Sequence, residues 1–268
     1  MRDRVTVDGK SDCPFFSSMN LSRVRPVATT AVLWTYFIGT FLAGYWMAFL
    51  VAGVLRGRRG IAWGLGSYCR GFFALLGLLV PRTRMVVPSR SELRESRGAV
   101  IVCNHVSFLD PLLMISLVPS AITIVRSDFF RVPIFGWLLR GAGFLGPRLF
   151  AEGQPWIDRV ARHLRMGGNL LIFPEGTRSR DGTLAAFKKG AFYLARLLAA
   201  PIVVLRVSGT EHLFPPGRLL FDSASTTPVQ VERLASISAN SAAAQTTHEL
   251  TLRVRGLYEP RPKPRPAT

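Results

Sequence analysis

The 268-residue sequence contains few cysteines and few histidines. Its three cysteines, Cys13, Cys69 and Cys103, show no CxxC spacing, and its four histidines are not clustered. These scarcities argue against a zinc site or a disulfide framework, and they indicate a reducing compartment. The sequence also lacks the GxSxG pattern that carries the nucleophile of serine lipases. We therefore expect neither a metal nor a serine nucleophile.

Acidic residues are also scarce, with 16 Asp and Glu against 34 Lys and Arg, so the formal net charge is +18. Only four of the basic residues are lysines. This charge predicts an anionic partner, such as nucleic acid, an anionic membrane, an acidic protein or a phosphorylated substrate. Arginine suits phosphate because its planar fork binds two oxygens at once. No zinc-finger or RNP-like pattern supports nucleic-acid binding.

Residues 27–55 lack charged side chains altogether. This segment is long enough to cross a bilayer, which takes about 20 apolar residues. A second apolar stretch, residues 61–80, carries Arg70 near its middle, which favours partial insertion over a full span. Basic residues flank every boundary, so residues 27–80 are predicted to form a membrane-associated helical hairpin whose two ends lie on the same, cytoplasmic, face. The alternative is a buried hairpin in a large soluble domain.

The remainder of the chain is predicted to be an α/β domain over residues 81–256. Short β-rich runs alternate with helical patterns, which indicates a mixed, largely parallel sheet flanked by helices. The expected strands are residues 84–87, 99–103, 121–125, 170–173 and 202–207, and the expected helices are residues 110–118, 129–141, 155–168 and 188–199. Residues 1–26 are expected to be a flexible tail, and residues 257–268 a basic, Pro-rich tail.

Two polar stretches each follow a predicted strand, where α/β sites lie. In the first, NHVSFLD (residues 104–110), His105 and Asp110 can meet across the first turn of a helix capped by Ser107 or Asp110. A carboxylate on one imidazole nitrogen leaves the other free to take a proton from an alcohol. Taken alone, the stretch fits a helix cap equally well.

The second stretch, FPEGTRS (residues 173–179), offers a carboxylate, a hydroxyl and an arginine on a glycine-containing turn. Arg178 and the backbone beside Gly176 could hold a phosphate. Arg180, Lys188 and Lys189 extend this group of cations. An isolated turn of this kind would be unremarkable, since Glu-Gly and Asp-Gly pairs mark turns in general.

Together and in this order, the two stretches resemble motifs of the glycerolipid acyltransferase family, which includes the 1-acylglycerol-3-phosphate (lysophosphatidate) acyltransferases. The first family motif, Asn-His-x4-Asp, stands at residues 104–110, and the third, FPEGTRS, is intact. Residues 131–137, 189–192 and 201–204 also look like family segments. The second family motif departs, because residues 143–148 keep Arg148 but lack the usual acidic residue.

The resemblance implies transfer of a fatty acyl chain from a thioester to the free hydroxyl of a lysophospholipid, most simply 1-acylglycerol-3-phosphate. It implies His105 as general base and Asp110 as the residue that orients it. Acyl carrier protein or coenzyme A would carry the acyl group, with no further cofactor, at the cytoplasmic face of a membrane such as the bacterial inner membrane. The residues expected to bind the acceptor or its phosphate are Arg148, Glu175, Gly176, Thr177 and Arg178, with possible support from Asn104, Ser107, Lys188 and Lys189.

Two alternatives remain at this point. The altered second motif leaves open another acceptor, such as lyso-ornithine lipid, glycerol 3-phosphate or another lysolipid. A non-enzymatic protein that binds membranes or nucleic acid would also account for the charge. The presence of both His105 and Asp110 favours the enzyme.

Overall fold

The structure is a computed structural model, and it describes residues 21–89, 92–93, 96–118, 120–146, 154–178 and 183–259. Most of the predicted N-terminal tail and residues 260–268 of the predicted C-terminal tail lie outside these ranges. Arg148 and Arg180, predicted to lie near the phosphate, and Ser179, the last residue of the FPEGTRS motif, also lie outside these ranges.

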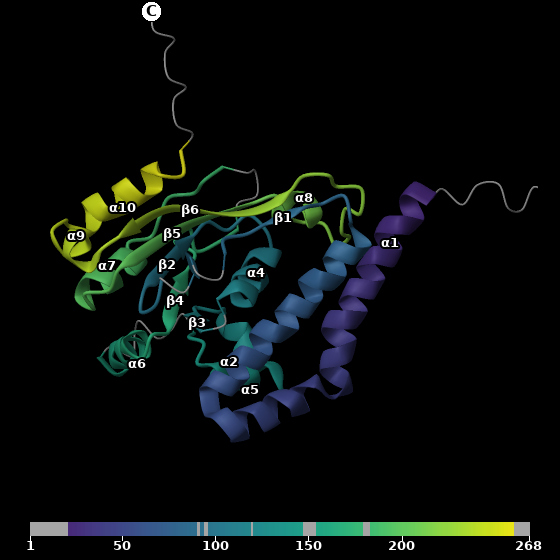
Figure 1. Cartoon of the computed structure of the whole chain (residues 1–268), viewed down its shortest axis with the longest axis horizontal. Helices are drawn as coiled ribbons and strands as arrows, with labels where there is room; N and C mark the ends of the chain where they lie inside the picture. Colours follow the sequence, from purple (N-terminus) through teal and green to yellow (C-terminus); the bar gives the residue numbers. More distant parts are fainter. Residues whose placement is uncertain are drawn as a thin grey trace, which may run out of the picture.

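A six-stranded sheet in the order β1-β6-β5-β2-β4-β3 forms the centre of the molecule (Figure 1). Neighbouring strands are parallel except β5 and β6, which are antiparallel. This confirms the predicted mixed, largely parallel class. The strands are β1 (Met85–Val86), β2 (Val100–Cys103), β3 (Ala121–Thr123), β4 (Asn169–Ile172), β5 (Ile202–Ser208) and β6 (Val229–Ile237).

Helices cover both faces of the sheet, so its central strands are apolar on both sides. In β2, Val100 and Val102 join one core cluster, while Ile101 and Cys103 join the other. This is why β2 is a continuous apolar run rather than an alternating one. The helices of the domain are α4 (Leu109–Leu117), η2 (Ser127–Arg131), α5 (Phe135–Ala142), α6 (Gln154–Arg165), α7 (Gly190–Leu197), α8 (Thr210–Leu213), α9 (Ala239–Ala243) and α10 (Thr247–Gly256).

One predicted helix, residues 129–141, is split into η2 and α5 in the structure. The break lies at Val132, whose ψ of 121° is extended. Val132 precedes Pro133, and the proline ring disfavours helical geometry in the residue before it. The C-terminal elements β6, α9 and α10 were not predicted.

The N-terminal helical region bends twice and returns to the domain. It comprises α1 (Leu21–Trp34), η1 (Thr35–Tyr45) and α2 (Trp46–Leu79). Gly44 (φ 122°) and Gly57 (φ 59°) break the helical geometry, so two arms are joined by a cross-piece (Figure 1). By length and apolar composition, residues 24–79 include enough for a membrane span. The bends give this region the shape of a hairpin.

The two arms of the hairpin pack against each other and against the domain. The rings of Tyr36 and Tyr68 stack with centroids 5.4 Å apart. Arg70 donates to the carbonyl oxygen of Ser116 in α4 at 3.1 Å and to Oγ of Ser67 at 2.6 Å. Arg70 therefore points toward the domain, which explains how a charged residue is accommodated in this apolar helix.

Candidate active site

The site lies where three adjacent parallel strands end. β2 lies between β5 and β4, and all three run in the same direction. Their carboxyl ends therefore meet at one edge of the sheet. The NHVSFLD stretch follows β2, FPEGTR follows β4, and Gly209 and Thr210 follow β5. Sheet order thus brings together loops that are far apart in the sequence.

The structure places His105 and Asp110 side by side. Nδ1 of His105 lies 2.9 Å from Oδ2 of Asp110; the Asp110 side chain is completely buried, and that of His105 is 17% exposed. The same Oδ2 accepts hydrogen bonds from the backbone N–H groups of Val106 and Ser107, both at 2.7 Å. With Nδ1 as the donor, Nε2 is the ring nitrogen able to accept a proton. No described residue bonds to Nε2.

The cap of α4 differs from the prediction. The helix begins at Leu109 with Phe108 as its N-cap residue, so neither Ser107 nor Asp110 has that position. Asp110 lies in the first turn and its carboxylate accepts from the N–H groups that precede the helix. One carboxylate therefore shapes the turn and orients the imidazole at the same time. The catalytic roles of His105 and Asp110 remain predictions.

Thr210 completes the surroundings of Asp110 and was missed in the sequence. Its hydroxyl donates to Oδ1 of Asp110 at 2.6 Å, and its side chain is fully buried at the start of α8. Each carboxylate oxygen is therefore held, Oδ2 by the turn and the imidazole, and Oδ1 by Thr210. No local pattern marks this threonine, because only the pairing of β2 with β5 brings it to the site.

Glu175 connects the second stretch to the first. Its Oε1 accepts from the backbone N–H of His105 at 2.8 Å, and its Oε2 accepts from the N–H of Ala185 at 3.2 Å. Burial raises the pKa of Glu175, while these two hydrogen bonds oppose the rise. The carboxylate is thus engaged with backbone groups that fix His105. Its proposed contact with an acceptor remains a prediction.

The cationic side of the site combines the FPEGTR turn with the segment before α7. Gly176, Thr177 and Arg178 are exposed, as are Lys188 and Lys189. Nζ of Lys188 lies so close to Gly176 that a Cβ there would be 2.5 Å from it. Lys188 therefore lies against the turn formed by Glu175 and Gly176. Phe173, which precedes this turn, has its ring centroid 4.6 Å from that of His105.

Asn104 and Ser107 hold the His105 loop in place. Asn104 donates from Nδ2 to the Val207 carbonyl oxygen at 2.8 Å and accepts from the Val207 N–H at 2.7 Å. The Ser107 hydroxyl donates to the Phe214 carbonyl oxygen at 3.0 Å. Both side chains are buried and bind the backbone of the β5 region. In this structure their contacts are structural.

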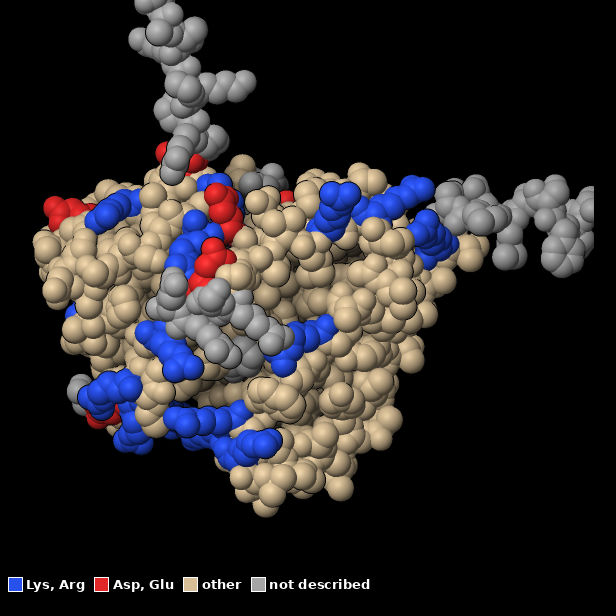
Figure 2. Space-filling view, viewed as in Figure 1, with Lys and Arg blue, Asp and Glu red and all other residues tan. Residues whose placement is uncertain are grey.

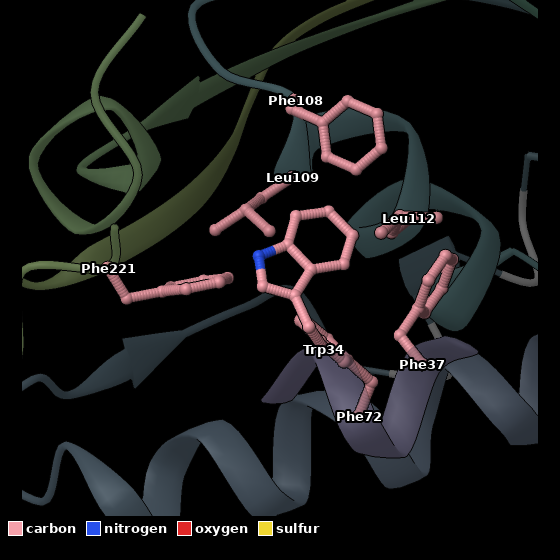
Figure 3. A pocket seen from close by; sticks show the side chains of 7 residues that line it. All are labelled: Trp34, Phe37, Phe72, Phe108, Leu109, Leu112 and Phe221. Atoms are coloured by element: carbon pink, nitrogen blue, oxygen red, sulfur yellow. The ribbon is translucent and has the colours of Figure 1, made fainter. Parts of the chain in front are cut away.

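A small apolar pocket is lined in part by Phe108 and Leu109, which lie between His105 and Asp110 in the sequence (Figure 3). Its lining comes from the hairpin, from the start of α4 and from Phe221. The indole of Trp34 lies at its centre, with Phe108 and Leu109 on one side (Figure 3). Trp34 also contacts Phe214, whose ring centroid is 6.2 Å away. The hairpin therefore contributes directly to the surroundings of the site.

Thr210 provides a test of how Asp110 is positioned. Thr210→Val keeps the shape but removes the hydroxyl, so Oδ1 of Asp110 loses its buried donor. Loss of a hydrogen bond to a charged group costs about 1.5–3 kcal/mol. For the acyl transfer that the family resemblance implies, we expect kcat to fall roughly tenfold or more, since about 1.4 kcal/mol of barrier corresponds to tenfold in rate.

Thr210→Ser keeps the hydroxyl and should restore most of the kcat, with KM for the acceptor little changed in both variants. Initial rates over a range of acceptor concentrations measure both constants. A Thr210→Val enzyme with unchanged kcat would contradict this role.

Comparison with known proteins shows which family the central part of the chain resembles. Residues 84–208 match the Acyltransferase family. A chloroplastic 1-acyl-sn-glycerol-3-phosphate acyltransferase of Brassica napus is 36% identical over 121 residues, which cover 44% of this chain but only 35% of that protein. The 1-acyl-sn-glycerol-3-phosphate acyltransferase of Salmonella typhimurium is 28% identical over 194 residues, covering 70% of this chain and 77% of that one.

A solved structure shares the fold. The 1-acyl-sn-glycerophosphate (LPA) acyltransferase PlsC from Thermotoga maritima superposes with a TM-score of 0.69 at 23% identity, covering 88% of this chain and 96% of that one. The family match spans both motifs and the strands that carry them. The predicted resemblance is thereby confirmed: residues 84–208 match the Acyltransferase family, and the chain is similar in sequence to 1-acyl-sn-glycerol-3-phosphate acyltransferases.

Proposed function

We propose that this protein is a membrane-associated O-acyltransferase that moves a fatty acyl chain from a thioester to the free hydroxyl of 1-acylglycerol-3-phosphate, which yields phosphatidate. The observation that carries the proposal is the His105–Asp110 pair, 2.9 Å apart at the strand ends of an Acyltransferase-family domain. The names of the relatives support the same acceptor.

The geometry of His105 and Asp110 supports a general-base mechanism for this transfer. Nε2 of His105 takes the proton of the acceptor hydroxyl as its oxygen attacks the thioester carbonyl carbon. Asp110 stabilises the imidazolium that forms on the same ring. When the carbon–sulfur bond breaks, the imidazolium returns the proton to the thiolate. The acceptor hydroxyl is the nucleophile, so no acyl-enzyme is required; Cys103, fully buried at the end of β2, has a pKa raised well above its usual range by burial.

The acceptor phosphate is proposed to bind beside the FPEGTR turn. Arg178 and Lys188 are exposed on this side of the site, and the ammonium group of Lys188 lies beside Gly176 in the turn. A guanidinium and an ammonium together offer a fork and a point charge for phosphate oxygens. Arg148 belongs to the same proposal, although it lies outside the described residues.

Arg178 should distinguish acceptors by their charge. We expect Arg178→Ala to raise the KM for lysophosphatidate roughly tenfold, because a charge-assisted hydrogen bond contributes about 1.5–3 kcal/mol. The KM for an acceptor without phosphate should stay within about twofold. Arg253→Ala, on α10, is the matched control and should change neither constant. An equal effect of Arg178→Ala on both acceptors would contradict the phosphate contact.

The altered second motif keeps lyso-ornithine lipid, glycerol 3-phosphate and other lysolipids as alternative acceptors. Competition assays with the full chain, offered these acceptors with either acyl carrier protein or coenzyme A thioesters, identify the preferred pair. Faster transfer to an acceptor other than lysophosphatidate would replace the acceptor in this proposal. It would leave the His105 mechanism intact.

The hairpin is proposed to insert partly into one leaflet, with both ends on the cytoplasmic side. One arm is bonded to the domain through Arg70, and the other contacts it through Trp34. Arms that pack against the domain in this way favour partial insertion over a full span. The cross-piece exposes apolar side chains, with Val54 79% and Leu55 71% exposed. An apolar face of this kind suits the boundary between lipid headgroups and acyl chains.

A further inference from the structure

The segment that runs from η2 into α5 exposes several large apolar side chains. Within residues 129–137, here called the 129–137 loop, Phe129, Ile134 and Trp137 are each 39% exposed and Val132 is 47% exposed. A few exposed apolar residues are normal on any protein surface. A cluster of four with two aromatic rings indicates an interaction surface.

The backbone of this loop is strained and tightly held. Ile134 has a φ of 60°, a region that β-branched residues rarely occupy. Such strain costs about 1–3 kcal/mol and persists only where the surroundings enforce it. Here Arg140 donates to the Phe130 carbonyl oxygen at 2.9 Å, and the Gly136 N–H donates to the Val132 carbonyl oxygen at 2.7 Å. The fold therefore presents these apolar side chains outward in a fixed arrangement.

The loop is continuous with the hairpin. Phe135 meets Phe41 of η1 edge-on, with ring centroids 6.1 Å apart. The Ile61 side chain of α2 lies against Gly141 of α5. Helix α5 therefore packs against residues on either side of the cross-piece, and it appears beside the hairpin turn in Figure 1.

Cationic side chains border this combined surface. Arg56, Arg58 and Arg59 lie at the end of the cross-piece, Arg131 lies within the loop, and Arg140 follows it; all five are exposed. Figure 2 shows basic side chains gathered along the lower edge of the molecule, beside an uncharged region that includes the hairpin. Apolar side chains with an interfacial tryptophan and neighbouring arginines are the composition that an anionic bilayer surface selects.

We propose that the 129–137 loop is a second membrane-binding element, which inserts Val132, Ile134 and Trp137 into the headgroup region of an anionic bilayer beside the hairpin. The proposal rests on the proposed membrane association of the hairpin. Two adjoining contacts that do not lie on one helix resist rotation of the domain on the bilayer. They hold the site at a constant angle to the surface from which the acceptor comes.

The test measures the depth of labelled positions in a bilayer. In the full chain with Cys13→Ser, an environment-sensitive fluorophore is attached at Val132→Cys or Phe129→Cys in the loop, and at Val54→Cys in the cross-piece. Leu252→Cys on α10, where Leu252 is 55% exposed, is the control. The remaining thiols, Cys69 and Cys103, are buried. Vesicles of phosphatidylcholine and phosphatidylglycerol carry a lipid-attached spin label that quenches nearby fluorophores.

We expect lipid quenching at Val54→Cys and at both loop positions, and none at Leu252→Cys. Quenching at Val54→Cys without quenching at either loop position would overturn the loop proposal and leave the hairpin association standing. No quenching at Val54→Cys or in the loop would overturn both. Without lipid, iodide quenching and gel filtration test whether a second copy of the chain covers this surface. If the loop labels are protected from iodide and the protein elutes as a dimer, the surface is a dimer interface. That result would likewise overturn the proposal.

Discussion

Replacement of His105 by alanine should reduce kcat/KM for acyl transfer by roughly 10³-fold, within the 10²–10⁴ that general acid–base catalysis contributes. This corresponds to about 4 kcal/mol of transition-state stabilisation. The acceptor hydroxyl is a poor nucleophile while it keeps its proton, and Nε2 of His105 can take that proton because Nδ1 of the same ring faces Asp110. Initial rates with a thioester donor and lysophosphatidate measure the loss.

The fold should tolerate the His105→Ala change. The side chain is partly exposed, and Glu175 bonds to the backbone N–H of residue 105, which alanine retains. His212→Ala is the matched control, because this histidine follows β5 near the same edge but its side chain is 59% exposed. We expect His212→Ala to act like the unmodified protein. Full activity of His105→Ala would refute its role as general base.

Replacement of Asp110 by alanine should damage both activity and stability. The change removes the acceptor for Val106 N–H, Ser107 N–H and the Thr210 hydroxyl, all in a buried turn. Breaking a buried polar network of this kind costs about 3–5 kcal/mol. The thermal unfolding midpoint should fall by roughly 10 °C at about 2–4 °C per kcal/mol. Activity should fall at least as far as in His105→Ala, since the imidazole loses its orienting partner.

Two further variants separate these effects. Asp110→Asn keeps an oxygen for the backbone N–H groups but removes the charge, so we expect most of the stability to return while activity stays low. Asp128→Ala removes an exposed carboxylate that pairs with Arg126, and should change stability by less than about 1 kcal/mol. Thermal unfolding midpoints and initial rates of the Asp110→Ala, Asp110→Asn and Asp128→Ala proteins separate the effect on stability from the effect on activity. A stable Asp110→Ala protein would contradict the central position of this carboxylate.

The parallel strands could be predicted well from the sequence because each is marked by the apolar residues of its own short segment. β2 is an uninterrupted apolar run, and β4 and β5 contain such runs at residues 170–172 and 202–205, as expected of strands buried on both faces. The polar stretches after them were readable for the same reason, since a change from apolar to polar residues marks where a strand ends. The contact of His105 with Asp110 followed from their spacing around one helix start.

The missing elements depend on long-range structure. β6 alternates buried and exposed residues at its start, with Val229 and Val231 inside and Gln230 and Glu232 outside, so it lacks the apolar run that marked the others. Thr210 is distant from Asp110 in the sequence and meets it only through sheet order. The bonds of Glu175 to His105 and Ala185 likewise join three loops, and no local pattern encodes them.

The place of β6 in the sheet has a consequence for biosynthesis. β6 is the last strand in the sequence, yet it lies between β1 and β5 and is the neighbour that pairs with β1. During translation the apolar hairpin leaves the ribosome first, and the sheet closes only after residues 229–237 have followed. Until then β1, which directly follows the hairpin, has no strand to pair with, and β5 has an open edge. Under the proposed membrane association, the hairpin can reach the bilayer before the sheet is complete, and the domain would then finish folding at the membrane surface.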